Sequence, residues 1–270
     1  MKIGKKEFST KGRTYVMGIL NVTPDSFSDG GKWNRMDAAL DHVEQMLDEG
    51  MDILDIGGES TRPGYTLISD QEEIERVVPM IEAVKARFDV PISLDTYKSN
   101  VAKAGLAAGA DMINDIWGLK YDAQMAQVIA QAGVACCLMH NRKAQDYNAF
   151  FPDMLDDLGQ TLAIAQKAGI SRDYILLDPG VGFAKSYENN LECVRRLPEL
   201  IAAFDLPVLL GTSRKSMIGL ALELPSDQRV EGTIATSVMA AMAGCRVGRA
   251  HEGQANKRAV RMTEAIVYGT

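Results

Sequence analysis

The amino-acid sequence predicts an α/β fold, a single (β/α)8 TIM barrel with an N-terminal β-hairpin. Eight short apolar runs recur along the chain, and segments with helical spacing lie between them. The chain has 270 residues, which suits one barrel of about 250 residues. Because no Pro/Gly/Ser-rich linker, charge block or low-complexity stretch interrupts it, we expect one domain over residues 1–270.

The eight apolar runs are typical of buried parallel strands, because most are continuously apolar instead of alternating with polar residues. They run from Tyr15 to Leu20, Ile53 to Ile56, Pro91 to Leu94, Met112 to Ile116, Ala135 to Met139, Tyr174 to Leu177, Pro207 to Leu210 and Cys245 to Val247. Between two of them, apolar residues at three- and four-residue spacing predict one face of a helix: Ile74, Val77, Val78, Ile81 and Val84. This β-α alternation favours a closed barrel over an open doubly wound sheet.

The residues before Tyr15 predict a β-hairpin. Ser9, Thr10, Lys11 and Gly12 lie between two short β-prone pieces and are typical of a turn. We expect this hairpin to cap the N-terminal end of the barrel.

The charge balance excludes several classes of partner. The net charge is -7 and the isoelectric point is near 5.1, so the chain lacks the cationic surface that nucleic acid or anionic membranes require. No signal-peptide core follows Met1, and no apolar run approaches the roughly 20 residues of a membrane span. We therefore expect a cytoplasmic protein that binds neither nucleic acid nor membrane and meets any anionic substrate with a local basic site.

The cysteines and histidines do not predict a metal cage. The four cysteines have no C-x-x-C spacing, so we interpret them as buried thiols, with a thiol nucleophile as the alternative: Cys136, Cys137, Cys193 and Cys245. Neither G-x-G-x-x-G nor a P-loop motif is present. If a divalent ion participates, we expect Mg²⁺ held by substrate phosphates, water and a protein oxygen such as that of Asn21.

Polar or ionisable side chains follow every predicted strand. In parallel barrels the active site lies at the carboxyl ends of the strands, where the βα loops converge. One Asp or Asn at such a position is more often a helix cap or a turn residue. Eight polar strand ends together are costly to crowd into one place, so they predict a site. They include Asn21, Arg62, Asp95, Asn114, His140, Asp178, Lys215, Arg249 and His251.

The residue types at these ends indicate the ligand. Asp95, Asn114 and Asp178 offer planar edges that suit a ring with N–H and amino groups, such as a pterin or a purine. A turn carboxylate before Pro179 is the alternative interpretation of Asp178. Basic residues follow the second, seventh and eighth strands, where barrels often hold phosphate: Arg62, Arg214, Lys215, Arg249 and His251. His42, in the middle of a predicted helix, is expected on the surface.

Two segments resemble the signature segments of the dihydropteroate synthases, namely Ile19 to Gly31 and Gly57 to Gly64. The resemblance continues in order over essentially the whole chain, through Ser93-Leu94-Asp95-Thr96, Ile113-Asn114-Asp115, Leu138-Met139-His140, Leu177 to Phe183, Ser213-Arg214-Lys215 and Arg249-Ala250-His251. It implies condensation of 6-hydroxymethyl-7,8-dihydropterin diphosphate with 4-aminobenzoate to 7,8-dihydropteroate and diphosphate in folate biosynthesis. It also implies Mg²⁺ as cofactor, competition by sulfonamides and a homodimer.

The resemblance implies a role for each site residue. Asp95, Asn114, Asp178 and Lys215 would hold the pterin, with Met139 lining its pocket, and Arg249 and His251 would bind the diphosphate. Asn21 would contribute to the Mg²⁺ site. Thr61, Arg62 and Pro63, with Phe27, Phe183 and Ser213, would shape the aminobenzoate pocket. The residues implied to be catalytic are Asp95, Asp178, Lys215 and Arg249.

One position departs from the family pattern, and two other functions remain open. The family more often has Asp after the final His, where this chain has Glu252-Gly253-Gln254. A methyltetrahydrofolate-dependent methyltransferase shares the pterin-binding barrel, but it is not expected to carry the Thr-Arg-Pro loop together with Ser213-Arg214-Lys215. A catalytically silent pterin-binding paralogue would have lost the diphosphate and aminobenzoate contacts, all of which are present here.

Overall fold

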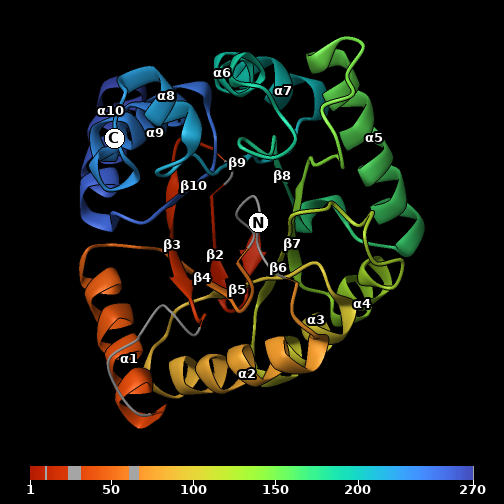
Figure 1. Cartoon of the computed structure of the whole chain (residues 1–270), viewed down its shortest axis with the longest axis vertical. Helices are drawn as coiled ribbons and strands as arrows, with labels where there is room; N and C mark the ends of the chain where they lie inside the picture. The colour runs from red at the N-terminus through yellow and green to blue at the C-terminus, as the bar shows by residue number, and fades with distance from the viewer. Residues whose placement is uncertain (10, 24–31, 61–66, 270) are drawn as a thin grey trace.

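In the computed structural model, eight parallel strands form the centre of the molecule and helices surround them (Figure 1). The structure describes residues 1–9, 11–23, 32–60 and 67–269. The strands of the barrel are β3 Tyr15–Asn21, β4 Ile53–Gly57, β5 Ile92–Asp95, β6 Met112–Asp115, β7 Ala135–Met139, β8 Ile175–Asp178, β9 Leu209–Leu210 and β10 Val247–Ala250. All eight predicted strands are confirmed, although the last two each begin two residues later than predicted, at Leu209 and at Val247.

The strands close into a barrel. Neighbouring strands follow chain order from β3 to β8, and β10 pairs with both β3 and β9. A parallel bridge between Leu177 and Val208 joins β8 to β9, where the N–H of Leu177 donates to the carbonyl of Pro207 at 3.0 Å. The prediction of a closed barrel instead of an open sheet is therefore confirmed.

Helices follow each barrel strand and cover the outside of the barrel. They are α1 Lys32–Asp48, α2 Asp70–Arg87, α3 Ser99–Ala108, α4 Met125–Ala132, α5 Phe150–Ala168, α6 Tyr187–Arg195, α7 Leu197–Phe204, α8 Ser216–Leu222, α9 Val230–Ala243 and α10 Gly253–Tyr268. Helix α2 shows why they form where they do: the hydroxyl of Ser69 accepts the N–H of Glu72, which caps the first turn. Its predicted apolar face is buried at Val77, Ile81 and Val84.

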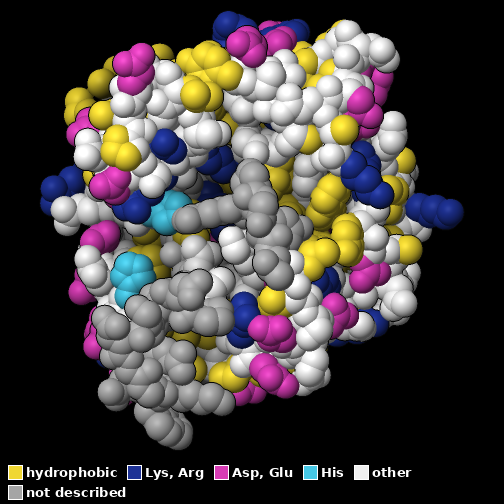
Figure 2. All heavy atoms as spheres, viewed as in Figure 1, with side chains coloured by type: hydrophobic (Ala, Val, Ile, Leu, Met, Phe, Trp, Pro, Cys, Tyr) yellow, Lys and Arg dark blue, Asp and Glu magenta, His cyan; other side chains and the backbone are white. Residues whose placement is uncertain are grey.

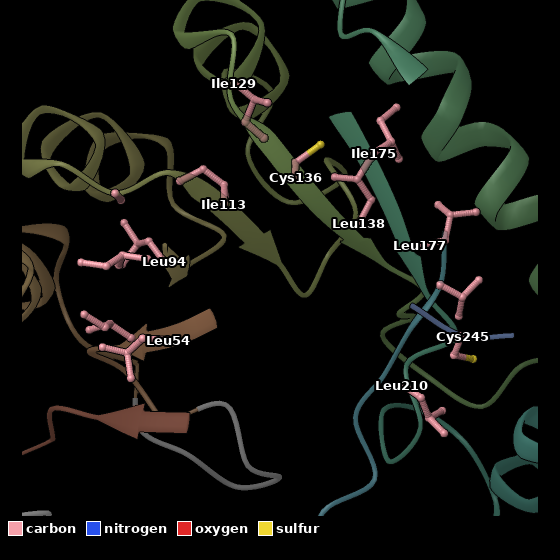
Figure 3. Close-up of a cluster of buried hydrophobic side chains, with 14 of the residues drawn as sticks. Leu54, Leu94, Ile113, Ile129, Cys136, Leu138, Ile175, Leu177, Leu210 and Cys245 are labelled. Atoms are coloured by element: carbon pink, nitrogen blue, oxygen red, sulfur yellow. The ribbon is translucent and has the colours of Figure 1, made fainter. Parts of the chain in front are cut away.

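Successive side chains of a strand point to opposite sides of the sheet, and in this barrel both sides are buried. One face packs against the helices, as Leu54, Leu94 and Leu138 do in the cluster of Figure 3. The other face fills the barrel interior with a second apolar cluster made of Tyr15, Met17, Ile53, Met112, Ala135, Cys137, Leu176, Leu209 and Val247, together with Ile3 and Phe8. Because this cluster uses the first residues of the strands, it closes the N-terminal end of the barrel.

The predicted N-terminal hairpin is confirmed, but the predicted position of its turn is wrong. Strands β1 (Lys2–Ile3) and β2 (Lys6–Glu7) pair antiparallel, so the chain turns at Gly4 and Lys5. Gly4 has a φ of +58° and packs against Asp111, where a side chain would collide. The stretch from Ser9 to Gly12 instead connects the hairpin to β3. Ile3 and Phe8 place the hairpin against the inner cluster, as a cap at the predicted end.

Several simpler expectations can be compared directly with the structure. All four cysteines are buried free thiols, and burial raises the pKa of each, which opposes a thiolate nucleophile. His42 is exposed on α1, as predicted. No helix in the described part of the chain is long and apolar enough to cross a membrane.

Candidate active site

The candidate site is the layer of side chains directly above the inner apolar cluster. Side chains two positions apart on a strand point to the same face. Asp55 follows Ile53 in this way, Asn114 follows Met112, Asp178 follows Leu176 and Arg249 follows Val247. The side chains inside the barrel therefore change from apolar to polar or ionisable over two residues of each strand. This change occurs towards the carboxyl ends of the strands, where barrel topology predicts the site.

Arg249 connects two carboxylates across three strands. Its Nε donates to Oδ2 of Asp55 at 2.7 Å, and its Nη2 donates to Oδ2 of Asp95 at 2.9 Å. The amide of Asn114 donates to the same oxygen of Asp55 at 3.3 Å. Asp55 is fully buried, so this one carboxylate orients both Arg249 and Asn114.

Asp55 is the functional residue that sequence reasoning missed. It lies inside the apolar run from Ile53 to Ile56, which we interpreted only as a strand. An ionisable side chain in a buried strand is costly unless it is paired. That single Asp within an otherwise apolar strand was the available signal.

Asp95 keeps one carboxylate oxygen available. Its Oδ1 is buried and has no hydrogen-bond partner among the described residues, and the same holds for Oδ1 of Asp55. Burial raises the pKa of Asp95 to about 7, the charge of Asp55 adds to this effect and Arg249 opposes it. An unpaired buried acceptor is expensive, and the N–H of a ligand is one group that can complete it.

Asp178 uses one carboxylate oxygen for the predicted turn contact, and its other oxygen is turned towards Gly211. Oδ1 accepts the N–H of Gly180 at 2.7 Å, which is the turn contact. Oδ2 lies on the side of Gly211, where it and Nζ of Lys215 are each 3.8 Å from the position a Cβ would take. Gly211 therefore leaves open the space between this carboxylate and this ammonium group. Burial raises the pKa of Asp178, and the charge of Lys215 opposes the shift.

Lys215 is placed by the start of α8, directly after the loop that follows β9. Its Nζ donates to the carbonyl of Val181 at 2.5 Å and lies 4.9 Å from the ring centroid of Phe183. Burial lowers the pKa of Lys215 to about 8, while Asp178 opposes the shift. The ammonium group of Lys215 thus lies between the carboxylate of Asp178 and the ring of Phe183.

A small apolar cluster forms a wall beside these polar groups. Met139 is buried with Tyr97 and Ile116, and Trp117 and Phe183 pack against them. Met139 is paired in register with Asp178. A flat ring held by Asp178 would therefore have apolar side chains beside it, which suits an aromatic heterocycle.

The loops after β9 and β10 are fastened to each other. The hydroxyl of Ser213 lies 2.9 Å from Nδ1 of His251 and accepts the backbone N–H of that residue at 3.2 Å. Arg214 donates through Nε to Oε1 of Glu252 at 2.5 Å. Glu252, the residue that departs from the family pattern, therefore forms an ion pair with Arg214. This ion pair holds the loops after β9 and β10 together.

Asn21 faces the site from the end of β3. Its Oδ1 and Oδ2 of Asp95 both lie 3.8 Å from the point where Gly57 would carry a Cβ. Within the described residues, no group of three or more His, Cys, Asp or Glu is arranged to hold a metal ion. One amide oxygen fits an ion such as Mg²⁺, which keeps several waters and binds substrate phosphates.

The segment that contains Thr61, Arg62 and Pro63 lies outside the described residues, as does Phe27. The residues on either side of positions 61–66 are tied together by a buried network. Lys98 contacts Glu59 at 2.7 Å and Glu73 at 2.8 Å, and it donates to the carbonyl of Ile68 at 2.9 Å. The N–H of Ile68 donates to Glu59 at 2.9 Å.

The chain is similar to known proteins over nearly its whole length. The model of a family described as pterin binding enzyme matches residues 17–251. The dihydropteroate synthase of Clostridium beijerinckii is 56% identical over 99% of each chain, and that of Bacillus subtilis is 50% identical over 96% of this chain and 90% of its own.

Solved structures agree with these relatives. A dihydropteroate synthase from Clostridium difficile, determined in the presence of pteroic acid, has a TM-score of 0.92 and 46% identity, with 98% of each chain covered. The Yersinia pestis dihydropteroate synthase in a sulfonamide drug complex has a TM-score of 0.91 and 41% identity over the same shares.

Proposed function

The chain belongs to the family of pterin-binding enzymes and is a dihydropteroate synthase by activity, and from this premise we propose how its residues share the reaction. The reaction joins 6-hydroxymethyl-7,8-dihydropterin diphosphate to 4-aminobenzoate and releases diphosphate. The observation that carries our proposal is the buried layer of carboxylates inside the barrel mouth, where Asp95 and Asp55 each keep an oxygen without a partner in the described structure.

The pterin ring is assigned to the buried polar side chains inside the barrel mouth. Asp95, Asn114 and Asp178 present acceptor and donor edges from β5, β6 and β8. A carboxylate that meets an N–C–NH2 edge makes two charge-assisted hydrogen bonds, which are the stronger kind. Lys215 completes the set as a donor, and Met139 supplies the apolar wall.

The diphosphate is assigned to the basic rim of the site, on Arg249 and His251. Asn21 would hold Mg²⁺ together with water and substrate phosphate, and this ion would neutralise charge on the leaving group. Acidic and basic side chains are interspersed over the face in Figure 2, so this face carries no broad basic surface. Arg249 is also held by Asp55 and Asp95, so its guanidinium is oriented before substrate binds.

The bond from the exocyclic carbon to the diphosphate oxygen breaks first in the proposed order, and the electron pair leaves with the diphosphate. The resulting positive charge on the pterin is stabilised by the carboxylates of Asp95, Asp178 and Asp55, which are already in place around the ring. The neutral aromatic amine then forms the new C–N bond and gives up one proton, which the released diphosphate or water accepts, so no covalent nucleophile of the protein takes part.

The aminobenzoate is assigned to Phe183 and Ser213, together with Thr61, Arg62 and Pro63, and sulfonamides are expected to compete there. Phe183 packs at the edge of the apolar cluster beside Lys215. Ser213 is held in place by His251. Both residues thus lie next to the groups assigned to the pterin and its leaving group, where the amine must attack.

The role of Asn21 can be measured directly. We expect 7,8-dihydropteroate to form only when both substrates and Mg²⁺ are present. Asn21→Ala should raise the Mg²⁺ concentration for half-maximal rate by about tenfold, because one ligand oxygen is lost. Asn100→Ala, which removes an exposed amide on α3, is the matched control. An unchanged Mg²⁺ requirement in Asn21→Ala would show that this residue is not part of the ion site. If the wild-type chain transferred a methyl group, or formed no 7,8-dihydropteroate, the synthase assignment would be contradicted.

A homodimer is proposed through the outer surface of α8, α9 and α10. Large apolar side chains are exposed there: Leu220, Leu222, Met239, Met242, Met262 and Ile266. Apolar side chains are visible along the upper left of Figure 2, where Figure 1 places these helices. Several large exposed apolar side chains on neighbouring helices suit a protein contact.

Met242→Glu is expected to convert the dimer to a monomer, because a carboxylate at the centre of an apolar contact would be buried without a partner. Light scattering coupled to size-exclusion chromatography measures the mass. Tyr121→Glu, at an exposed apolar residue near α4, is the control and should leave the dimer unchanged. A dimer that persists in Met242→Glu would place the contact elsewhere.

We infer further that residues 1–270 form one domain and act in the cytoplasm. Every helix and strand of the described chain belongs to the barrel or to the hairpin that caps it. The acidic composition supports an environment without nucleic acid or membrane as partner.

A further inference from the structure

The loop that follows β8, residues 179–186, is held by three side chains: one from the loop itself, one from the connection between β7 and α5, and one from α6. Lys185 donates through Nζ to the carbonyl of Phe183 at 3.0 Å. The hydroxyl of Tyr147 donates to the carbonyl of Ala184 at 3.0 Å. The amide of Asn190 donates to the carbonyls of Lys185 and Ser186, at 3.4 and 2.8 Å. Four consecutive carbonyls in this loop therefore accept a hydrogen bond from a side chain, so its backbone is unusually well defined for an irregular segment.

The side chain of Lys185 folds back under its own loop, and the residue is only 6% exposed. Its other contacts are with His140, whose Nδ1 lies 2.9 Å from Nζ, and with the carbonyl of the same residue at 3.5 Å. A buried ammonium group is costly unless its protons are all bound. Here the acceptors are two carbonyls and a ring nitrogen, so Lys185 ties the end of β7 to the loop after β8.

The partner histidine is itself fixed. Burial lowers the pKa of His140 to about 3, and the charge of Lys185 acts in the same direction. The ring is therefore neutral, which leaves Nδ1 as the acceptor for Lys185 and Nε2–H as the donor to Asp157, at 3.0 Å. Asp157 also accepts from Nε of Arg142 at 2.6 Å. Lys185 thus rests on a chain of bonded side chains that extends to α5.

The loop presents two groups to the active site. The carbonyl of Val181 accepts the hydrogen bond of Lys215, and the ring of Phe183 lies beside the same ammonium group. The backbone of the loop packs closely against the end of β7. Gly180 has a φ of +70°, and a Cβ there would lie 2.0 Å from the carbonyl oxygen of His140. A shift of the loop would therefore displace Phe183 and loosen the contact to Lys215.

We propose that Lys185, assisted by Tyr147, is a positioning residue for 4-aminobenzoate: it holds the carbonyl of Phe183 and so fixes the ring against which this substrate packs. The inference rests on the role of Phe183 given under Proposed function. Lys185 lies under the loop and touches Phe183 through its backbone, so it acts on the substrate through Phe183.

Lys185→Met tests the proposal. The variant keeps an apolar side chain of similar length, and because the bonded partners of Lys185 are a ring nitrogen and carbonyls, no carboxylate loses its direct ion pair. We expect the KM for 4-aminobenzoate to rise by about tenfold or more, since small displacements in a site have large kinetic effects. The dissociation constant of the pterin diphosphate should stay within about twofold. Lys257→Met is the control: Lys257 is also a partly buried lysine, but it pairs with Asp52 and does not contact the loop, so neither constant should change.

Phe183→Ala and the double variant separate the two claims. If Lys185 acts through Phe183, the double variant should have the same KM for 4-aminobenzoate as Phe183→Ala alone. A raised KM in Phe183→Ala with an unchanged KM in Lys185→Met would overturn the role of Lys185 only. An unchanged KM in Phe183→Ala would overturn the aminobenzoate role of Phe183 itself.

Tyr147→Phe decides the question if Lys185→Met does not fold, as judged by circular dichroism and thermal melting. This change removes one hydroxyl and the hydrogen bond to Ala184. A severalfold higher KM for 4-aminobenzoate at unchanged pterin affinity supports the proposal, and a wild-type KM overturns it.

Discussion

Lys215→Ala is expected to lower kcat/KM for dihydropteroate formation by about a thousandfold while the barrel stays folded, which is the size of effect seen when a fixed charged donor is removed from an active site. The ammonium group and Oδ2 of Asp178 each lie 3.8 Å from the position that a Cβ of Gly211 would take, and the ammonium group donates to the carbonyl of Val181. Without it, the pKa of the buried Asp178 should rise further, so the pterin loses a donor and an ionised acceptor together. A continuous assay of diphosphate release measures the rate.

Lys257→Ala is the matched control for this variant. Lys257 is also a partly buried lysine paired with an aspartate, Asp52, but Asp52 precedes β4 and therefore lies at the opposite end of the barrel. We expect this control to keep wild-type turnover. Thermal melting of both variants would show that the fold is retained, and wild-type diphosphate release from Lys215→Ala would refute the assignment.

Asp95→Asn is expected to weaken binding of the pterin diphosphate by at least about tenfold, because loss of one partner in a buried charge-assisted contact costs about 1 to 3 kcal/mol. The variant should also lose the pH dependence of binding. With a pKa of about 7, the wild-type carboxylate becomes protonated as the pH falls through that value, so affinity should fall with it. Calorimetry between pH 6 and pH 8 measures both effects.

The same group makes a stability prediction of opposite sign. The pKa of Asp95 is raised in the folded chain from its ordinary 3.8, so the folded state keeps a proton that the unfolded state releases. The stability that this group contributes is therefore lost as the pH rises from about 4 towards 7, and Asp95→Asn should be less sensitive in that window. Burial also raises the pKa of Asp115 to about 6, so Asp115→Asn should reduce the pH sensitivity of stability in much the same window. Asp115→Asn is therefore the control for pterin affinity only, which it should leave unchanged because its carboxylate is bonded to the N–H groups of Trp117 and Leu119. Pterin affinity that is equal in wild type and Asp95→Asn would contradict the role of Asp95.

The sequence by itself determined the architecture and most of the site. Continuous apolar runs identify buried strands, and helical spacing between them identifies the covering layer, because both depend on local periodicity. The placement of Asp95, Asn114, Asp178 and Lys215 on one rim followed from parallel topology, since all strands of a parallel barrel end at the same face. The error at the hairpin arose because two turn-forming stretches, at Gly4 and at Ser9 to Gly12, compete within a few residues.

Only the tertiary structure decided which of these groups touch. Arg249 contacts Asp55 and Asp95 across 194 and 154 residues of sequence, and no local pattern encodes that choice. Closure of the barrel places β10 beside β3 and so brings Arg249 to Asp55, a buried carboxylate within an apolar run. The seat of Lys185 under its loop depends in the same way on His140 from another strand. The physical reason is that periodicity reports which face a side chain occupies, whereas the partner it meets there depends on how distant strands and loops come together.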